Sequence, residues 1–364
     1  MKWAGIYCYL FVLATVLGVV FTRVAIWIAA RTGALEQPGE RKIHQVPMPL
    51  LGGLGVLLAI AACLGINLLF ALFAASRGEG SSLLPAAVAE YLPGVVKMLP
   101  RVLAIFGGGV IIFLVGLWDD LYGMRARAKL LCQALVSLLL VYFGIKVTLF
   151  SGNPFLNCVL TIFWVVAITN SFNLLDNMDG LCGGVAVVTS AVFFIVSARM
   201  GEYFVSSFIA VFCGAVLGFL FLNFRPARIF LGDAGSMLIG YLVATFTILG
   251  TYYKGSFPTP FPVVMPIIIL ALPLYDMASV VLIRIRLNKP IYIGDTNHFS
   301  HRLVKLGMSQ RGAVLFIYLV TLSTALPALL LPYVDMGGVV IVLFEVVLVL
   351  GVVGFLEYYA ERKK

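Results

Sequence analysis

Two adjacent carboxylates end one of the long apolar stretches of this chain. They are Asp119 and Asp120, and Lys129 follows shortly after them. Neighbouring carboxylates repel each other unless a cation or a shared proton lies between them. Either arrangement suits phosphoryl transfer, in which negative charge is neutralised and protons are moved. A solvated helix end, with nearby arginines as counter-ions, is the simpler alternative.

A second polar group occurs where another apolar stretch ends. Asn170, Asn173 and Asp176 are spaced three apart, so on a helix they share one face, and Asp179 nearly continues it. Such a stripe is costly at a membrane span unless it binds something. Carboxylate and amide oxygens suit magnesium or manganese better than zinc. A helix cap followed by a turn would explain at most two of these residues.

A third group lies in residues 223–236, which contain Asn223, Phe230, Gly232 and Asp233. Asp233 precedes an apolar stretch and could simply cap the helix there, because aspartate is a favoured cap. The start of a helix is also a ready site for a phosphate, and glycine lets the backbone approach a ligand closely. Capping and ligand binding both remain open for this segment.

Two of the three histidines of the chain share one polar loop. They are His298 and His301, followed directly by Arg302. Histidine and arginine together suit the binding of a diphosphate, whereas a zinc site would need further Cys or His ligands nearby. The third histidine, His44, lies beside basic residues that could alternatively anchor that loop at a membrane surface.

One carboxylate falls within an apolar stretch close to these segments. Asp276 is about two helical turns from Arg284, which marks the end of its stretch. Carboxylates inside a membrane are functional candidates by default. Asp276 is therefore expected to support the same site.

The elements that position these residues are membrane-spanning helices. Hydrophobic residues make up 62% of the 364 residues and charged residues only 11%, against about 25% charged in soluble domains. We predict an all-α integral membrane protein with one membrane-embedded domain, residues 1–364. Its spans number about eleven, at about 20 apolar residues each. They are predicted at 4–30, 50–75, 101–118, 129–148, 155–172, 183–198, 204–222, 236–252, 263–285, 312–332 and 338–358.

The basic residues predict the orientation of the chain. Of the Lys and Arg residues outside the first span, 17 follow odd-numbered spans and 7 lie on the other side. Basic loops stay in the cytoplasm, so the N-terminus is expected outside and the C-terminus inside. All the candidate residues then face the cytoplasm, in loops near 31–50, 119–129, 170–183, 223–236 and 286–311. The net charge of +9 is explained by this bias rather than by a nucleic-acid partner.

The ordered set of motifs resembles the polyprenyl-phosphate N-acetylhexosamine-1-phosphate transferases, and the likeness covers nearly the whole chain. It rests on Asp119-Asp120, the run from Asn170 to Asp179, residues 223–236 and the loop of His298 and His301. The family implies transfer of a sugar 1-phosphate from a UDP-sugar to a polyprenyl phosphate in the bacterial inner membrane. UMP is released, and a lipid-linked cell-envelope glycan begins. A homodimer is one candidate assembly.

The same resemblance implies roles for individual residues. Asp233 and Asn173 are expected to bind Mg²⁺, with Mn²⁺ as a substitute. Asp119 is expected to activate the acceptor, and Asp120 to be its partner that faces the metal or a phosphate. Uracil is expected at Asp179 and Phe230. The remaining matched positions are expected to contact substrate or phosphates, or to serve catalysis. They are His44, Lys129, Asn170, Asp176, Asn223, His298, His301 and Arg302.

The closing motif points to one branch of the family. The sequence Gly232-Asp233-Ala-Gly-Ser and the His-Arg-Leu ending resemble the branch that transfers GlcNAc-1-phosphate. The branch that uses UDP-MurNAc-pentapeptide is the alternative. This chain has Ser300 where branches of the family often carry another histidine, which leaves the histidine roles open.

Three other functions are compatible with parts of the pattern. An intramembrane prenyltransferase also uses aspartate pairs and magnesium, but leaves the third segment and the histidine loop unexplained. A CDP-alcohol phosphotransferase needs a longer motif that this chain lacks. A transporter predicts polar residues at mid-membrane in paired repeats, whereas these lie at one interface.

Overall fold

The computed structural model describes residues 2–36, 47–76, 92–148, 152–288, 290 and 298–362. This part of the chain is mostly α-helix, as predicted, with two short strands. The main helices are α1 (Lys2–Thr32), α2 (Gly52–Ser76), α4 (Leu92–Tyr122), α5 (Ala126–Tyr142), α6 (Pro154–Leu175), α7 (Leu181–Arg199), α8 (Tyr203–Asn223), α9 (Gly232–Leu249), α11 (Ala271–Arg286), α13 (Gln310–Ala325) and α14 (Met336–Arg362). Shorter elements are β1 (Leu35–Glu36), β2 (Met48–Pro49), η1 (Phe261–Val264), α10 (Met265–Ile269), α12 (Phe299–Lys305) and η2 (Leu326–Tyr333).

The helices follow the predicted spans closely. Within the described ranges, nine helices are long and apolar enough to cross a membrane, and a bent pair of helices would make a tenth. The remaining predicted span, 129–148, corresponds to α5, which has 17 residues. The chain is therefore an all-α polytopic membrane protein. Residues 200–202 separate α7 from α8, in agreement with the separate spans predicted at 183–198 and 204–222.

The bent pair has an identifiable cause. The segments Phe261–Ile269 and Ala271–Arg286 meet at an angle of 63°. Pro273 lies in the first turn of α11, and its ring clashes with the carbonyl of Ile269 in any continuous helix. The bend therefore separates α10 from α11, and α11 carries Asp276 at its own angle through the bundle.

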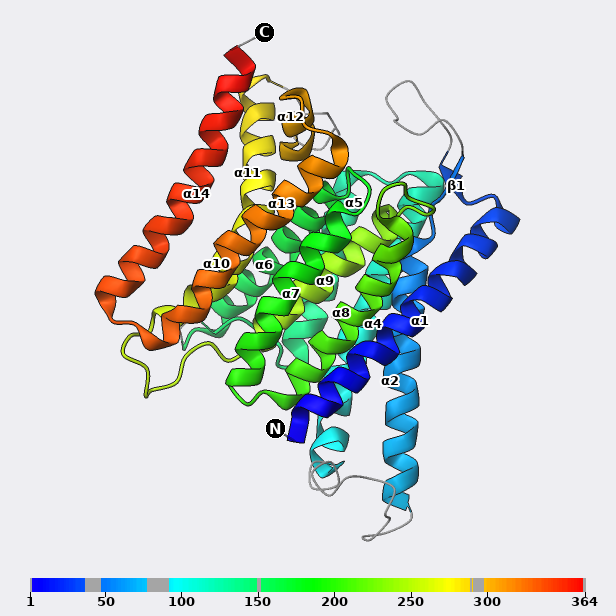
Figure 1. Cartoon of the computed structure of the whole chain (residues 1–364). Coiled ribbons are helices and arrows are strands. Elements are labelled where there is room, and N and C mark those ends of the chain that lie inside the picture. Colours follow the sequence, from blue (N-terminus) through cyan, green and yellow to red (C-terminus); the bar gives the residue numbers. More distant parts are fainter. Residues whose placement is uncertain are drawn as a thin grey trace.

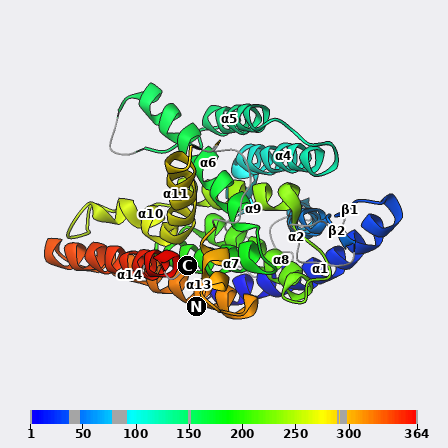
Figure 2. The same ribbon diagram turned by 90° about the horizontal axis from the view of Figure 1, so that it is seen from above.

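Helix α9 lies in the middle of the bundle (Figure 2). It packs against α2, α4, α6 and α7, and most of its side chains are buried. Gly116 allows the end of α4 to approach closely, because a Cβ there would lie 2.5 Å from the Cα of Ala234. The first turn of α9 is therefore held against the last turns of α4.

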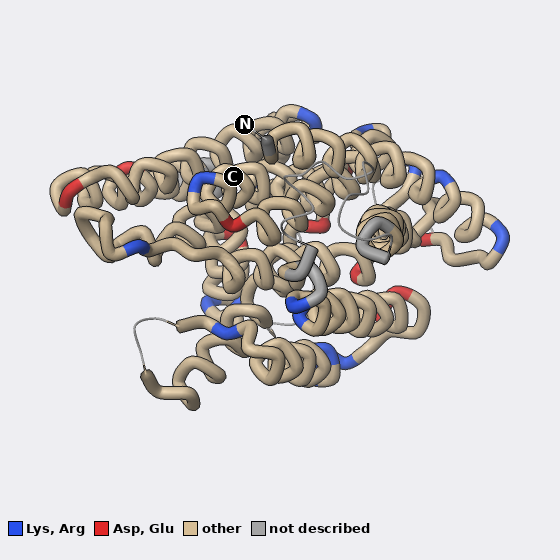
Figure 3. Tube along the Cα trace, turned by 90° about the horizontal axis from the view of Figure 1, so that it is seen from below, with Lys and Arg blue, Asp and Glu red and all other residues tan. Residues whose placement is uncertain are grey.

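The two termini lie at opposite ends of the bundle (Figure 1). Strand β1 and helix α12 lie at the end that carries the C-terminus. Charged residues are sparse along the trace, most of which is tan in Figure 3. Termini on opposite sides agree with the predicted topology, while the number of crossings and the side that faces the cytoplasm stay predictions.

Backbone hydrogen bonds join the loop after α8 to the start of α2. Strands β1 and β2 pair antiparallel. Phe230 donates its backbone N–H to the carbonyl of Pro49 in β2 (2.8 Å), and Gly52 donates to the carbonyl of Phe230 (3.0 Å). These bonds fix the backbone that leads into Asp233.

Candidate active site

Asp233 is the centre of a polar cluster contributed by four helices. Its Oδ2 accepts a hydrogen bond from Lys129 Nζ in α5 (2.9 Å), and its Oδ1 accepts one from Asn173 Nδ2 in α6 (2.9 Å). Lys129 also forms an ion pair with Asp119 at the end of α4. One ammonium group therefore lies between two carboxylates. The sequence predicted a cation or a proton between Asp119 and Asp120, whereas Lys129 lies between Asp119 and Asp233.

The cluster is open to ligands. The side chain of Asp233 is 33% exposed, and those of Lys129 and Asp119 are 21% and 13% exposed. Asn173 donates from its amide nitrogen to both Asp233 and Ser236. Its carbonyl oxygen remains available as an acceptor or a metal ligand.

Asp120 has a different surrounding from its neighbour Asp119. Its Oδ1 accepts the backbone N–H of Asp233 (2.9 Å), and its Oδ2 accepts that of Ala234 (3.0 Å). Asp120 therefore caps α9 from another helix and holds Asp233 in place. It was expected to face metal or phosphate, but both of its oxygens are directed to the start of α9 because α4 packs directly against that helix end.

Asp233 is not the cap of α9, contrary to the simpler interpretation of its position. The helix begins at Gly232, and its N-cap residue, Leu231, makes no side-chain cap bond. Gly232 has a φ of +73°, and a Cβ there would meet Asp120 Oδ2 at 2.6 Å. Only glycine fits this conformation and this contact comfortably, and the side chain of Asp233 is left free to face Lys129 and Asn173.

The loop after α6 contributes two more carboxylates. Asp176 follows the last turn of α6, and Asp179 Oδ2 accepts the backbone N–H of Ala227 in the loop after α8 (3.3 Å). Burial raises the pKa of Asp176 well above its ordinary value, and the negative charges of Asp233 and Asp120 raise it further. Asp176 therefore keeps its proton more readily than an exposed carboxylate does.

Two predicted substrate ligands are directed to the protein itself. Asn223 is buried, accepts the backbone N–H of Gly180 (2.9 Å) and donates to the carbonyl of Ile229 (2.8 Å). It ties the loop after α6 to the loop after α8. Asn170 donates to Gln133 Oε1 (2.6 Å) and to the carbonyl of Val166 (2.8 Å). It therefore points to α5, one turn away from Asn173.

Gln133 is a member of this polar group that the sequence analysis missed. It lies one turn after Lys129 on α5, and it is fully buried. A signal was present, since Lys129 and Gln133 are spaced by four and share a helix face with the buried Ser137. Gln133 and Asn170 form a second polar layer beneath Lys129, Asn173 and Asp233.

The histidine segment is held against the site by side chains of two other elements. Ser300, on α12, donates to Asn177 Oδ1 after α6 (2.5 Å), and Arg302 Nη2 donates to Ser279 Oγ on α11 (2.8 Å). His298 contacts Asp276, and the centroids of the His298 and His301 rings are 6.4 Å apart. His44, the third predicted histidine, lies outside the described residues.

These donors fit a magnesium ion. Within the described ranges, no three Asp, Glu, His or Cys side chains converge to form a complete metal cage. Magnesium rarely needs one, because it is held by one or two carboxylates together with waters and substrate phosphates. Asp233, Asp119 and the free carbonyl oxygen of Asn173 supply such a partial set.

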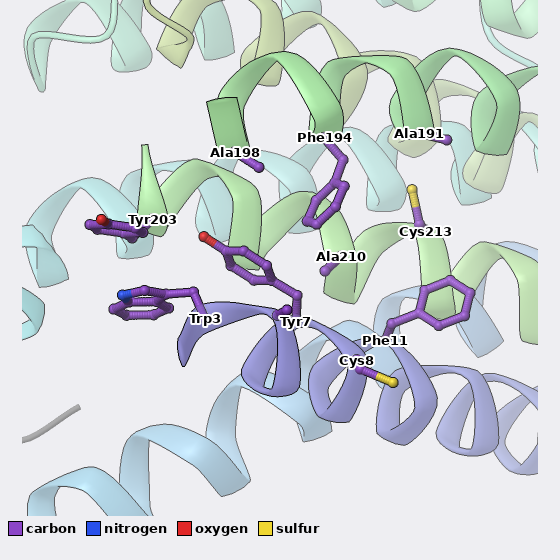
Figure 4. A pocket seen from close by; sticks show the side chains of 11 residues that line it. Trp3, Tyr7, Cys8, Phe11, Ala191, Phe194, Ala198, Tyr203, Ala210 and Cys213 are labelled. Atoms are coloured by element: carbon purple, nitrogen blue, oxygen red, sulfur yellow. The ribbon is translucent and has the colours of Figure 1, made fainter. Parts of the chain in front are cut away.

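A separate cavity of about 680 Å³ lies between α1, α7 and α8 (Figure 4). Its wall is mostly aromatic and small apolar side chains, including Trp3, Tyr7, Phe194 and Tyr203. Trp3 and Tyr203 stack with ring centroids 4.5 Å apart. No residue of the polar cluster lines this cavity, so it is not the site described above.

Comparison with known proteins identifies the family. A probable undecaprenyl-phosphate N-acetylglucosaminyl 1-phosphate transferase of Bacillus subtilis (strain 168) is 33% identical over 330 residues, covering 88% of this chain and 84% of that protein. A protein-family model described as "Glycosyl transferase family 4" matches residues 102–251 of this chain. The chain belongs to glycosyl transferase family 4. The resemblance seen in the motifs is thereby confirmed, and the chain is an enzyme.

Other similar transferases also align with most of this chain. A decaprenyl-phosphate N-acetylglucosaminephosphotransferase of Mycobacterium tuberculosis (strain ATCC 25618 / H37Rv) is 31% identical, covering 80% of this chain and 74% of that protein. An undecaprenyl-phosphate alpha-N-acetylglucosaminyl 1-phosphate transferase of Escherichia coli (strain K12) is 29% identical, covering 83% and 76%. Residues 102–251, matched by the family model, contain every member of the Asp233 cluster.

Proposed function

We propose that this transferase moves GlcNAc-1-phosphate from UDP-GlcNAc to a polyprenyl phosphate, with undecaprenyl phosphate as the expected acceptor. The names of the three relatives above support the sugar and the acceptor class. A bacterial cytoplasmic membrane is the expected location, because a multi-pass enzyme there can reach both a soluble nucleotide sugar and a membrane lipid.

The Asp233 cluster is the observation that carries this proposal. It brings carboxylates, one ammonium group and an amide to a partly open surface at the ends of the helices. An acceptor phosphate on a lipid lies at such a surface, and a soluble donor can enter from the adjoining aqueous side. A prenyltransferase would leave the histidine segment without a role.

The proposed chemistry is one direct displacement. An oxygen of the lipid phosphate attacks the β-phosphorus of UDP-GlcNAc, the new P–O bond forms, and the bond from that phosphorus to UMP breaks. UMP leaves with its oxygen, and the product is a polyprenyl diphosphate carrying GlcNAc. The lipid phosphate is itself a nucleophile, so no protein nucleophile is required.

The side chains of the cluster would align two anions and remove a proton. Asp119 would take the residual proton of the acceptor phosphate, since its carboxylate lies beside Lys129 in the partly open cluster. Lys129 would neutralise developing charge while holding Asp119 close to Asp233. Asp120 would act indirectly, by fixing the backbone of Asp233.

Asp233 and Asn173 would hold a magnesium ion, which would supply neutralisation of the donor's phosphate charge. Manganese would be expected to substitute. The carboxylates of Asp119 and Asp233, which share one lysine, support a cation at this end of the bundle.

The remaining residues would bind the donor. Asp179 and Phe230 would hold uracil, and both lie in loops that meet beside Ala227 and Asp233. His298, His301 and Arg302 would contact the diphosphate from α12. Asn223 and Asn170 are better explained as residues that hold the loops and helices in place.

The decisive experiment uses membranes containing the protein. Undecaprenyl phosphate and a panel of radiolabelled UDP-sugars are supplied, and the lipid product and UMP are both measured. Lipid-linked GlcNAc formed in step with UMP is the expected result. Transfer from UDP-MurNAc-pentapeptide alone, or UMP formation that does not depend on the lipid, would contradict the proposal.

A further inference from the structure

Asp276 is a carboxylate inside a membrane helix that the reaction above does not use. It lies on α11, it is 1% exposed, and it contacts two successive residues at the start of α12. Its Oδ1 accepts the backbone N–H of Phe299 (2.8 Å), and its Oδ2 lies 3.3 Å from Nδ1 of His298. One buried carboxylate therefore holds both the backbone and the imidazole ring of this segment.

The geometry restricts the protonation of the histidine. A carboxylate is only an acceptor of hydrogen bonds, so the ring nitrogen facing Oδ2 must carry the hydrogen. A buried carboxylate oxygen without a hydrogen-bond donor costs free energy. The ring orientation that places Nδ1–H beside Oδ2 is therefore favoured over one that turns the ring away from Asp276. With Nδ1–H directed to Asp276, Nε2 is the only ring nitrogen left for a ligand.

We propose that Asp276 is a positioning residue for His298, which it holds with Nδ1 protonated so that Nε2 faces the donor phosphates. The neutral ring then presents Nε2 as a proton acceptor, and the charged ring presents it as a donor to a phosphate oxygen. In serine proteases an aspartate likewise accepts a hydrogen bond from Nδ1–H of the catalytic histidine and so fixes its tautomer. The tautomer follows from the contacts alone, whereas the catalytic role rests on the proposed function.

Two further bonds explain why the histidine can be held so firmly. Arg302 is tied to Ser279 on the same helix as Asp276, and Ser300 is tied to Asn177 beyond α6. The helix α12 is thus fixed at three points, and among these three ties the one from Asp276 involves the imidazole. Ser279 therefore offers a matched control, since it lies one turn from Asp276 and holds the same short helix without touching His298.

The tautomer can be tested by NMR on the full-length protein. The chain has three histidines, so ¹⁵N-histidine labelling gives few signals, and the His298→Gln variant identifies the one of interest. A protonated Nδ1 in the unmodified protein is the expected result. Asp276→Asn should move the hydrogen to Nε2, because the asparagine oxygen stays with Phe299 and its NH₂ group then faces Nδ1. Ser279→Ala should leave Nδ1 protonated.

A signal showing Nε2–H and a bare Nδ1 in the unmodified protein would overturn the proposal, and this measurement does not depend on how the variants fold. It also does not depend on activity. Failure of the transferase assay with UDP-GlcNAc would therefore count against the proposed function and leave the tautomer assignment standing.

A double-mutant cycle tests the catalytic role. Asp276→Asn is expected to lower kcat by about 100-fold or more in the otherwise unmodified enzyme, since a misassigned tautomer is costly. In the His298→Gln background the same change should lower kcat by less than about twofold, because the effects of two residues that act through one another are not additive. An equal loss in both backgrounds, or full activity of His298→Gln, would show that Asp276 does not act through His298.

Discussion

Asp120 accepts a hydrogen bond from the backbone nitrogen of Asp233 at 2.9 Å, so the end of α4 caps the start of α9. Its neighbour Asp119 turns instead to Lys129 and to the backbone N–H of Met124. Two adjacent aspartates thus have separate partners and do not share one cation. One fixes the backbone of the site, and the other faces its open surface.

This division predicts different effects of two similar substitutions. Asp120→Asn should lower stability by about 0.5–2 kcal/mol, because a lost helix cap leaves a backbone N–H of α9 facing an NH₂ group. Asp119→Asn should lower activity while changing stability less. The measurement is the Tm of both variants in one detergent, beside their transferase rates. Equal Tm values for the two variants would contradict the capping role.

Activity should depend on a divalent cation and on Asp233. Asp233→Asn is expected to lower the rate about a thousandfold, which corresponds to a loss of about 4 kcal/mol of transition-state stabilisation. The rate should fall in excess chelator and return on adding magnesium or manganese. Full activity of the unmodified enzyme in chelator would be incompatible with the proposed metal. Ser256→Cys, on an exposed loop at the other end of α9, provides a matched control.

Asp119→Asn should retain weak activity that increases with pH. The second pKa of a phosphate monoester is about 6, so above that pH most of the acceptor has already lost its proton and needs a base less. The pH profile of the variant, measured at saturating UDP-GlcNAc, should therefore rise through this range more steeply than that of the unmodified enzyme. Labelled UMP or sugar phosphate trapped on Asp119 in the absence of lipid would instead indicate a covalent route.

The topology predicts which positions a membrane-impermeant thiol reagent can reach on intact cells. Ser256 and Met308 are both exposed, on loops assigned to the outside and the cytoplasm respectively. Ser256→Cys should be labelled on intact cells, and Met308→Cys only after lysis. Both are made in a Cys8→Ser background, since Cys8 is the exposed native cysteine in the described part of the chain. The reverse pattern would invert the topology.

The sequence predicted the helices and the membership of the site better than the contacts within it. Long apolar stretches determine where helices lie, so α6 and α7 fall within a few residues of their predicted spans. Residue types and order were enough to group Asp233 with Lys129 and Asn173. That the candidate residues would gather at one end of the bundle was also predictable, because helix ends in a polytopic protein gather at two surfaces.

Contacts that depend on the packing of helices distant in sequence were not predictable. The cap that Asp120 provides requires α4 to approach α9 at Gly116, and no local pattern gives that distance. The bonds of Asn223 to Gly180 and Ile229 likewise depend on how two loops meet. Gln133 was not grouped with the site because its spacing of four from Lys129 gains its meaning only from Asn170, which lies on a separate helix.

The order in which the chain is made has a bearing on the Asp233 cluster. Lys129 and Asp119 are 10 residues apart, whereas Lys129 and Asp233 are separated by 104. During synthesis the first pair can therefore form as soon as α5 follows α4 into the membrane, so that each charge enters with a counter-ion. Asp233 arrives only after three more helices, α6, α7 and α8, have been made. The active enzyme is thus assembled around an ion pair that the nascent chain formed much earlier, and a ribosome stalled before α9 would leave a charged but inactive half-site.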